Sequence, residues 1–366
     1  MRPFEYVRAK DVVTAVAESA AGTTSNGSGT FGGSVKFIAG GTNIIDLMKE
    51  DVMRPARLVD INALPLATIE VTDSGGMFLG ALARNADTAY HPVVRTRFPL
   101  LTAAILAGAS PQLRNTATNG GNLLQRTRCV YFYDVVAPCN KREPGTGCSA
   151  IGGLTRQHAI LGASDQCIAT HPSDMCVALA ALDARVHVTS DAGPRVIPLV
   201  DFHRLPGDRP HLDTNLSAGE LITHIELPSE AATFADHSAY LKFRDRASYS
   251  FALVSVAAAL DLSDDGSVKQ ARIAIGGVAH KPWRSAEAEG LLGGRQPTEA
   301  NFALAADALL AGAAGQGDND FKIGMAHRAV VRAMTVATAG TVTNTGEIPP
   351  GSGEGPANGE VQNERN

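Results

Sequence analysis

The 366-residue chain lacks the features that would mark several classes of protein. It has no basic excess: 32 lysines and arginines face 37 aspartates and glutamates, so nothing in its charge favours nucleic acid or an anionic membrane as a partner. No apolar run is long enough to span a bilayer. The first residues, MRPFEYVR, lead into polar sequence without the apolar core of a secretory signal. We therefore expect neither a membrane-spanning segment nor a signal peptide.

Cysteine is scarce, and its number is odd. Five cysteines in a chain of this length argue against a disulfide scaffold, so metal ligation or plain burial is expected. Cys176 lies in an apolar helical pattern and is expected to be a small buried hydrophobe. The other four lie among turn residues: Cys129, Cys139, Cys148 and Cys167. Their spacing fits neither a zinc ribbon nor a bacterial ferredoxin, which leaves an iron–sulfur cluster, a zinc site and unligated thiols open.

The remaining composition is that of a soluble protein with strands and helices. At 44% hydrophobic, the chain can bury a sizeable core in two or three domains. Alternating patterns predict strands at 35–38, 57–61, 77–82, 185–189, 195–199, 219–228 and 271–278, and helical patterns predict helices at 99–107, 300–310 and 321–337. We expect a mixed sheet in the middle of the chain and a helix-on-sheet unit after it. Ser25 to Gly33 is expected to be a flexible loop.

Two glycine-containing loops have the character of anion-binding sites. The first, Gly40-Gly41, follows a strand and precedes a helix that Thr42 or Asn43 would cap. The second, within Leu113–Leu123, contains Gly120-Gly121 among Asn and Thr residues, whose successive N–H groups could converge on one point. Two such loops suit the two anionic groups of a diphosphate. A tight turn without a ligand is the alternative for the first loop.

A His-Pro-Ser-Asp turn precedes the apolar helical pattern that begins near Cys176. Ser173 or Asp174 is a natural N-cap there, and capping alone would explain both residues. The functional alternative is that Asp174 accepts hydrogen bonds from ligand hydroxyls.

Together, four stretches resemble the FAD-binding subunit of the molybdenum hydroxylases, the xanthine dehydrogenase and carbon monoxide dehydrogenase family. They are FIAGGTN at 37–43, LRNTATNGGN at 113–122, HPSD at 171–174 and GGVAHKPWR at 276–284. The resemblance covers about residues 1–338 and implies an α+β fold. It implies a FAD-binding domain of two α/β subdomains over 1–230 and a small α+β carboxyl-terminal domain like that of the CO dehydrogenase flavoprotein over 236–338. The composition, and not the resemblance, predicts a disordered tail at 340–366, which has almost no large apolar residue.

An insertion at about 126–169 is absent from most of that family. Its sequence around Cys129 and Cys139 resembles the FAD subunit of bacterial aldehyde oxidoreductases, in which the insertion carries a [4Fe-4S] cluster. The resemblance implies that the cluster ligands are Cys129, Cys139, Cys148 and Cys167.

The resemblance also implies a set of FAD-binding residues. They are Lys36, Phe37, Ile38, Ala39, Gly40, Gly41, Thr42, Asn43, Ile44, Ser110, Thr118, Asn119, Gly120, Gly121, Asn122, Asp174, Ile222 and Lys242. By the same resemblance, 39–43 and 118–121 surround the pyrophosphate and Asp174 faces the ribityl or ribose hydroxyls. Ile222 would offer a backbone contact to the adenine, and Lys242 would lie near the isoalloxazine ring.

The resemblance implies an electron-transfer subunit of an aldehyde oxidoreductase. FAD would take electrons from a partner's clusters and pass them to an external small-molecule acceptor, whose approach Arg244, Asp245, Arg246 and Tyr249 would shape together with Lys242. Substrate oxidation would occur on a large molybdenum-cofactor subunit, in a heterotrimer with a small [2Fe-2S] subunit, so no catalytic residue is expected here. The alternatives are a free-standing flavin reductase and a scaffold with structural zinc.

We expect the chain to act in the periplasm. Such a complex would be exported across the membrane already folded, directed by a twin-arginine signal on one of its partners. A cytoplasmic complex is the alternative.

Overall fold

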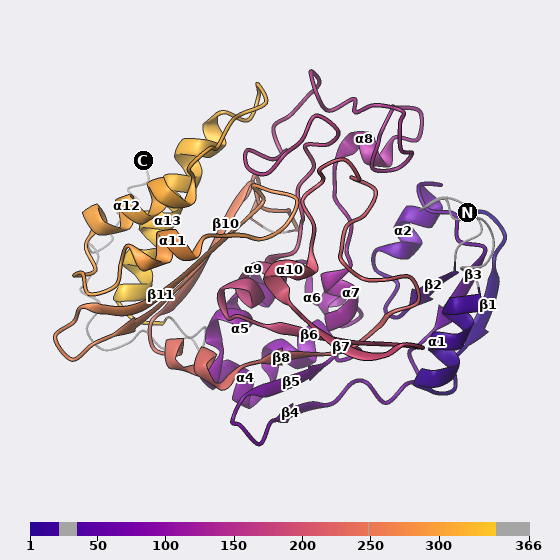
Figure 1. Cartoon of the computed structure of the whole chain (residues 1–366), viewed down its shortest axis with the longest axis horizontal. Coiled ribbons are helices and arrows are strands. Elements are labelled where there is room, and N and C mark those ends of the chain that lie inside the picture. Colours follow the sequence, from indigo (N-terminus) through magenta and orange to yellow (C-terminus); the bar gives the residue numbers. More distant parts are fainter. Residues whose placement is uncertain (22–34, 248, 342–366) are drawn as a thin grey trace, which may run out of the picture.

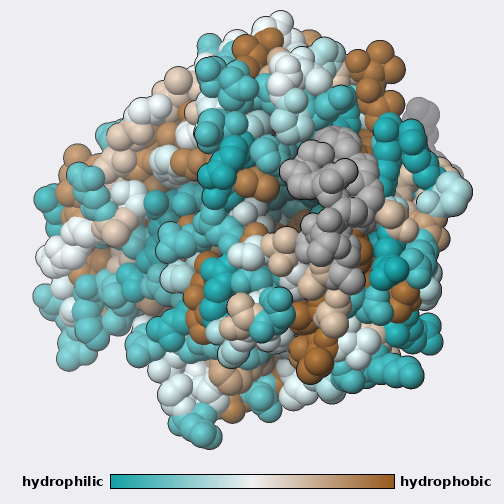
Figure 2. Space-filling model, turned by 45° about the vertical axis from the view of Figure 1, so that its right-hand side comes forward, coloured by the Kyte–Doolittle hydropathy of each residue, from teal (hydrophilic) through white to brown (hydrophobic). Residues whose placement is uncertain are grey.

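The computed structural model describes residues 1–21, 35–247 and 249–341. The loop expected at 25–33 lies outside the described residues, and so does the tail expected at 340–366 except for its first two residues. The fold is α+β, as predicted, with three sheets that follow one another along the chain (Figure 1). Where the chain is described, no helix is both long and apolar enough to cross a membrane. Hydrophilic and hydrophobic residues are interspersed on the face that Figure 2 displays.

The amino-terminal part is a small parallel sheet with two helices. Its strands are β1 (Glu5–Arg8), β2 (Val35–Ile38) and β3 (Arg57–Asp60), in the order β1-β3-β2, and its helices are α1 (Val12–Ala21) and α2 (Ile44–Lys49). The loop from β2 to α2 carries Gly40 and Gly41, so the strand-loop-helix unit expected there is present.

The second part is built on a sheet of five strands in the order β4-β5-β8-β6-β7. The strands are β4 (Ile69–Val71), β5 (Met77–Gly80), β6 (Arg185–Ser190), β7 (Gly193–Pro198) and β8 (Leu221–Leu227). Every neighbouring pair is antiparallel, so the expectation of a mixed sheet is wrong. The reason is the connections: β4–β5 and β6–β7 are tight hairpins, and no helix crosses between parallel neighbours in this sheet.

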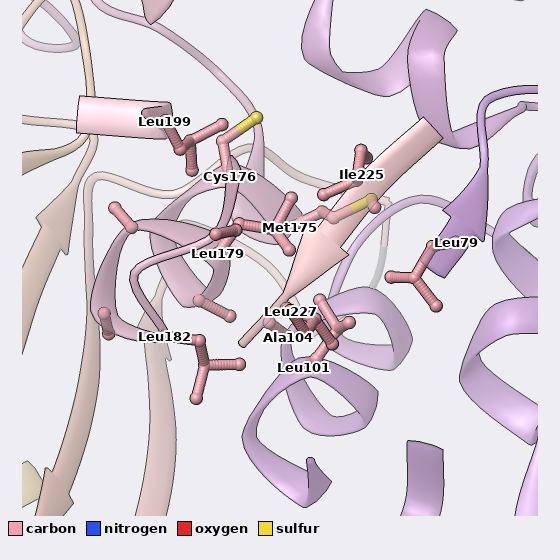
Figure 3. Packing of buried hydrophobic residues seen from close by; sticks show 14 of the residues in the cluster. Leu79, Leu101, Ala104, Met175, Cys176, Leu179, Leu182, Leu199, Ile225 and Leu227 are labelled. Carbon is pink, nitrogen blue, oxygen red and sulfur yellow. The ribbon is translucent and has the colours of Figure 1, made fainter. Parts of the chain in front are cut away.

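Helices fill the connection between β5 and β6 and form the core with this sheet. They are α3 (Asn85–Tyr90), α4 (Pro92–Arg97), α5 (Pro99–Ala107), α6 (Pro111–Arg114), α7 (Asn119–Leu123), α8 (Val130–Tyr133) and α9 (Asp174–Ala181), and α10 (Leu199–Phe202) follows β7. The helix predicted at 99–107 matches α5. All eight residues of α9 are buried. Figure 3 shows side chains of α9 packed beside those of α5 and β8: Met175, Leu179, Leu101, Ala104, Ile225 and Leu227.

The carboxyl-terminal part is an antiparallel sheet covered by helices, as expected. Its strands are β9 (Ser238–Phe243), β10 (Val254–Leu262), β11 (Val268–Gly276) and β12 (Trp283–Arg284); its helices are α11 (Ala286–Gly290), α12 (Glu299–Leu309) and α13 (Phe321–Thr338), with a 3-10 helix at Ser229–Phe234 before it. The helices α11 to α13 lie on one side of this sheet and α9 packs on the other (Figure 1). Strand β11 ends before Gly277, whose φ of +74° does not continue a strand.

The insertion at 126–169 contains only α8 and otherwise consists of turns and isolated bridges. A buried charge network fixes it to the rest of the chain. Asp213, between α10 and β8, accepts a hydrogen bond from Arg126 Nε at 2.6 Å and forms an ion pair with Lys141. Lys141 is 1% exposed and also donates to the Pro210 carbonyl at 2.8 Å, and its Nζ lies 2.6 Å from His280 Nε2. The network therefore joins the insertion to the middle and carboxyl-terminal parts.

Burial alone would raise the pKa of Asp213, but Arg126 and Lys141 outweigh it and hold the pKa below its usual range. A carboxylate with a lowered folded-state pKa stabilises the fold above its unfolded-state pKa of about 3.9, and this stabilisation is lost as the pH falls from there through the folded-state value.

We predict that Asp213→Asn lowers the free energy of unfolding by about 3–5 kcal/mol, because two buried cations lose their carboxylate. Urea unfolding should give the same loss at pH 5 and pH 8, since both lie above the unfolded-state pKa. The matched control is Asp261→Asn, whose partner Lys269 is 67% exposed, and it should cost less than about 1 kcal/mol. Equal losses in the two variants would show that the network does not anchor the fold.

Candidate cofactor site

The two predicted glycine loops lie against each other. A Cβ atom on Gly40 would collide with the Thr116 carbonyl, so the β2–α2 loop packs directly on the segment that leads into α7. Gly41 has a φ of +73°, a conformation that glycine adopts without strain. The structure therefore brings together two segments that are about 75 residues apart in the sequence, as a ligand with two anionic groups requires.

Two backbone N–H groups of the second loop do not point toward a ligand site, contrary to the expectation. The Asn119 and Gly120 N–H groups donate to the carbonyls of Ala83 and Ala81, at 2.9 and 2.8 Å. They point into the fold, so the predicted convergence of successive N–H groups does not include them. The Asn119 side chain is also fully buried. This corrects the expected nest, because carbonyls of the turn that follows β5 already accept hydrogen bonds from these donors.

The residues on either side of Asn119 and Gly120 form the rest of the second loop. Thr118 is the N-cap of α7, and its hydroxyl accepts a hydrogen bond from Gly121 N at 3.2 Å. Gly121 itself is exposed, and a Cβ there would meet only the Thr118 hydroxyl oxygen within 4 Å. Asn122 is half-buried, and its amide donates to Asn85 and accepts from Ser173. Open space above Gly121 fits the close approach of a phosphate.

The side chain of Asn43, next to the first glycine loop, has a buried donor without a hydrogen-bond partner. It occupies the N-cap position of α2, but its side chain does not cap the helix, contrary to the simplest expectation. Its Oδ1 instead accepts from the backbone N–H of Arg126 at 2.9 Å. Its Nδ2 is buried and has no hydrogen-bond partner. A buried amide donor beside two glycine loops is what an anionic oxygen would satisfy.

The other residues predicted on β2 and its loop form a half-buried surface. They are Lys36, Phe37, Ile38, Ala39, Thr42 and Ile44. Burial, together with the charge of Arg126, lowers the pKa of Lys36. Apolar residues left half-covered on this strand offer a surface for an apolar or aromatic part of a ligand.

Asp174 and Lys242, predicted at different parts of the flavin, form a buried ion pair. Ser173 and not Asp174 is the N-cap of α9, since its hydroxyl accepts from Cys176 N at 3.0 Å. The Asp174 carboxylate accepts from Lys242 Nζ at 2.8 Å and from the Tyr240 hydroxyl at 2.7 Å. Both charged side chains are less than a tenth exposed. Burial and the Asp174 charge raise the pKa of Tyr240 well above its usual value.

A cavity adjoins this ion pair. Its lining comes from the insertion, the turn before α9 and the carboxyl-terminal sheet: Thr127, Arg128, Cys129, Val130, Leu154, Arg156, Gln157, His158, Thr170, His171, Pro172, Ser173, Asp174, Phe251, Ala252, Ser255, Gly276 and Gly277. The Arg128 guanidinium lies over the Phe251 ring, 4.9 Å from its centre. We call this the flavin pocket, because Asp174 lines it; none of the other residues predicted to bind FAD is part of its lining.

The remaining predicted residues are placed as follows. Ser110 caps α6 and accepts from Leu113 N at 3.3 Å. Ile222 is 4% exposed, packs in the core and pairs with Val188 of β6. In the acceptor group, Arg244 donates to Ala107 O at 3.2 Å and Asp245 pairs with Arg156 at 2.7 Å. Arg246 donates to Tyr249 O at 3.0 Å, and Tyr249 is 62% exposed. None of this last group lines the flavin pocket.

The four loop cysteines surround a second, smaller cavity. Cys129, Cys139, Cys148 and Cys167 all line it, and none forms a disulfide. Within the described residues no three of their sulfurs lie within 4.8 Å of one another. A single tetrahedral zinc ion, with Zn–S bonds of about 2.3 Å, holds its sulfurs only about 3.8 Å apart. The ring of thiols is therefore wider than one ion needs and fits a cluster of several irons better.

The protonation of these thiols depends on a metal. Burial raises the pKa of Cys129 to about 12 and that of Cys167 to about 11, so both stay protonated at neutral pH when no metal is bound. Ligation must then release protons. His158 Nε2 lies 3.1 Å from the Cys129 sulfur. Cys129 lines the flavin pocket as well, so the two cavities share this residue.

Several residues of the site were not predicted from the sequence. Tyr240 could have been found, since it alternates with Lys242 on β9 and both therefore face Asp174. Lys141, Asp213 and His158 could not, because their partners lie in distant segments of the chain.

Comparison with known proteins agrees with this geometry. The model of the FAD binding domain in molybdopterin dehydrogenase matches residues 2–230, and that of the CO dehydrogenase flavoprotein C-terminal domain matches residues 238–337. The chain is 51% identical over 305 residues to the aldehyde oxidoreductase FAD-binding subunit of Escherichia coli (strain K12), which covers 83% of this chain and 92% of that protein. It is 28% identical over 252 residues to the glyceraldehyde dehydrogenase medium chain of Sulfolobus acidocaldarius, which covers 69% and 71% of the two.

A solved structure agrees as well. A chain of the carbon monoxide dehydrogenase from Hydrogenophaga pseudoflava aligns with a TM-score of 0.70 and 27% identity, over 93% of this chain and 99% of that one. These findings confirm the resemblance seen in the sequence. The chain belongs to the FAD-binding medium subunits of the molybdenum hydroxylase family of oxidoreductases.

Proposed function

We propose that this chain is the FAD- and [4Fe-4S]-containing electron-transfer subunit of a molybdenum-dependent aldehyde oxidoreductase. It would carry electrons from partner [2Fe-2S] clusters, through FAD, to an external acceptor. The observation that carries the proposal is the shared residue Cys129, which lines both the four-thiol cavity and the flavin pocket. Two redox groups bound in these cavities would be neighbours. The aldehyde specificity rests on the similarity to the aldehyde oxidoreductase FAD-binding subunit at 51% identity.

The residues present fit FAD. The open face of Gly121 and the unpartnered Asn43 amide would hold the pyrophosphate, and the buried Asp174 carboxylate would face the sugar-like hydroxyls. Lys242 donates a charge-assisted hydrogen bond that holds the Asp174 carboxylate in place. When bound, FAD and the cluster supply the electron-carrying chemistry that the side chains of this chain lack.

The residues around the thiols fit a cluster rather than a lone ion. They form a cavity with Phe132 and Lys141 in its lining, and Phe132 is fully buried. Such a lining would exclude water from the metal, and the buried ammonium of Lys141 would favour added negative charge nearby. We therefore favour the iron–sulfur alternative over zinc and over unligated thiols.

The partners follow from the same proposal: a large molybdenum-cofactor subunit and a small [2Fe-2S] subunit in a heterotrimer. The rivals are a free-standing flavin reductase and a zinc scaffold. An optical spectrum of the purified chain separates them, because flavin bands with broad cluster absorbance require both redox groups, whereas zinc is silent.

We predict that Gly121→Val gives a folded protein with little or no FAD. A valine there meets only the Thr118 hydroxyl within the fold but fills the space above the loop. Flavin content per chain and the far-ultraviolet circular dichroism spectrum measure the two effects. Gly290→Val is the matched control, since a Cβ there meets nothing within 4 Å and lies outside the loop. Full flavin occupancy in Gly121→Val would refute the assignment of this loop.

We predict that replacing any one of the four loop cysteines by serine removes most of the iron, because a cubane needs four thiolate ligands. Cys176→Ala should keep its iron, since this thiol is fully buried in α9 and does not line the four-thiol cavity. Iron, zinc and acid-labile sulfide per chain are the measurements. Zinc in place of iron, or a full complement of iron in Cys148→Ser, would contradict the proposed ligand set.

We propose further that the complex acts in the periplasm and is exported folded with a partner that carries a twin-arginine signal. Cofactors must be inserted before export, so one signal would serve the whole assembly. Cells that express all subunits, with and without the partner's signal, should differ in the periplasmic fraction of this chain. Recovery from the cytoplasm in both strains would establish the cytoplasmic alternative instead.

A further inference from the structure

Three metal-ligating side chains meet in the interior, outside the four-thiol cavity. They are His171, in the turn before α9, Cys176 on α9, and His203, directly after α10. Their ligand atoms lie within 4.8 Å of one another, and no other such group of three occurs in the part of the chain that is described. Figure 3 shows Cys176 beside Leu199 of α10, apart from Leu101 and Leu227 in the middle of the apolar cluster.

Three of the four ring nitrogens in this group lack a hydrogen-bond partner. Both ring nitrogens of His171 are buried without a hydrogen bond, and so is Nδ1 of His203. The two rings lie 4.2 Å apart, centre to centre. Native interiors seldom leave buried polar atoms unpaired, and a bound ion is one explanation for such atoms.

The hydrogen bonding of His203 identifies the free lone pair. Its Nε2 lies 2.8 Å from the Leu123 carbonyl, and only a protonated nitrogen can donate to a carbonyl. The proton is therefore on Nε2, which leaves Nδ1 with a lone pair that is free to bind an ion. A histidine that donates its other N–H to a backbone carbonyl is oriented as metal-ligating histidines are.

The charge of the group selects the ion. Two neutral imidazoles and one thiolate carry a total charge of −1, and Cys176 and His203 are 0% and 2% exposed. A dry interior disfavours net charge, so a monovalent cation leaves the least uncompensated charge. Nitrogen and thiolate donors suit soft copper(I), whereas structural zinc usually takes four protein ligands.

We propose that His171, Cys176 and His203 form a buried, three-coordinate site for copper(I). Binding exchanges the thiol proton of Cys176 for the metal and releases that proton to solvent, with no change of oxidation state. The site is distinct from the proposed cluster, because none of its three residues lines the four-thiol cavity.

The test is an anaerobic copper(I) titration of the full chain, purified with its flavin and iron, against a chromogenic chelator. The wild-type chain should retain one more equivalent of copper than Cys176→Ala. This difference is independent of what the four loop cysteines bind, because both proteins carry them. His203→Phe should lose the same equivalent, and the copper X-ray absorption spectrum should report one sulfur and two nitrogen neighbours.

His187→Phe is the matched control. The His187 ring stacks on His224 at 4.1 Å, but within the described residues no cysteine joins this pair. This variant should bind as much copper as the wild-type chain. Equal copper in the wild-type chain and Cys176→Ala would overturn the proposal, and so would retention of zinc(II) but not copper(I) by the site.

Discussion

The carboxylate of Asp213 is a central group among those that hold the insertion in place. It lies between two buried cations, Arg126 at the start of the insertion and Lys141 within it. Neither cation would be tolerable in the interior without it, because an unpaired buried charge is far more costly than an unpaired surface charge. The insertion contains only one short helix and therefore has few of the repeated backbone hydrogen bonds that hold helices and sheets together. Paired charges contribute to its attachment instead.

The same cations create the electrostatic surroundings of the thiols. Lys141 lines the thiol cavity and also reaches Asp213 and the His280 imidazole. Anchoring the insertion and setting the charge beside the cysteines are thus two effects of one side chain. Lysine suits the position because its ammonium is a compact donor with three hydrogens, and each can be directed at a different segment.

Much of the fold could be predicted from the sequence because its signals are local. Proline at the start of α5 and the glycines between β2 and α2 act within a few residues, and both predictions agree with the structure. The inward direction of the Asn119 N–H could not be predicted, since it depends on strand β5 lying beside α7. The pairing of Asp174 with Lys242 is likewise invisible in the sequence, because 67 residues separate the two positions. The prediction of a mixed middle sheet was wrong for the same reason, because the pairing of its strands depends on distant segments.

The two ends of the insertion have a consequence for how such a chain could arise. Thr127 at one end and Thr170 just past the other line the same pocket, so the segment leaves and re-enters the fold at one place. Segments with adjacent ends can be gained or lost without moving the sheets that flank them, and a longer loop adds little closure entropy. A domain built to bind one redox group could therefore acquire a second beside it in a single evolutionary step, with its original architecture left intact.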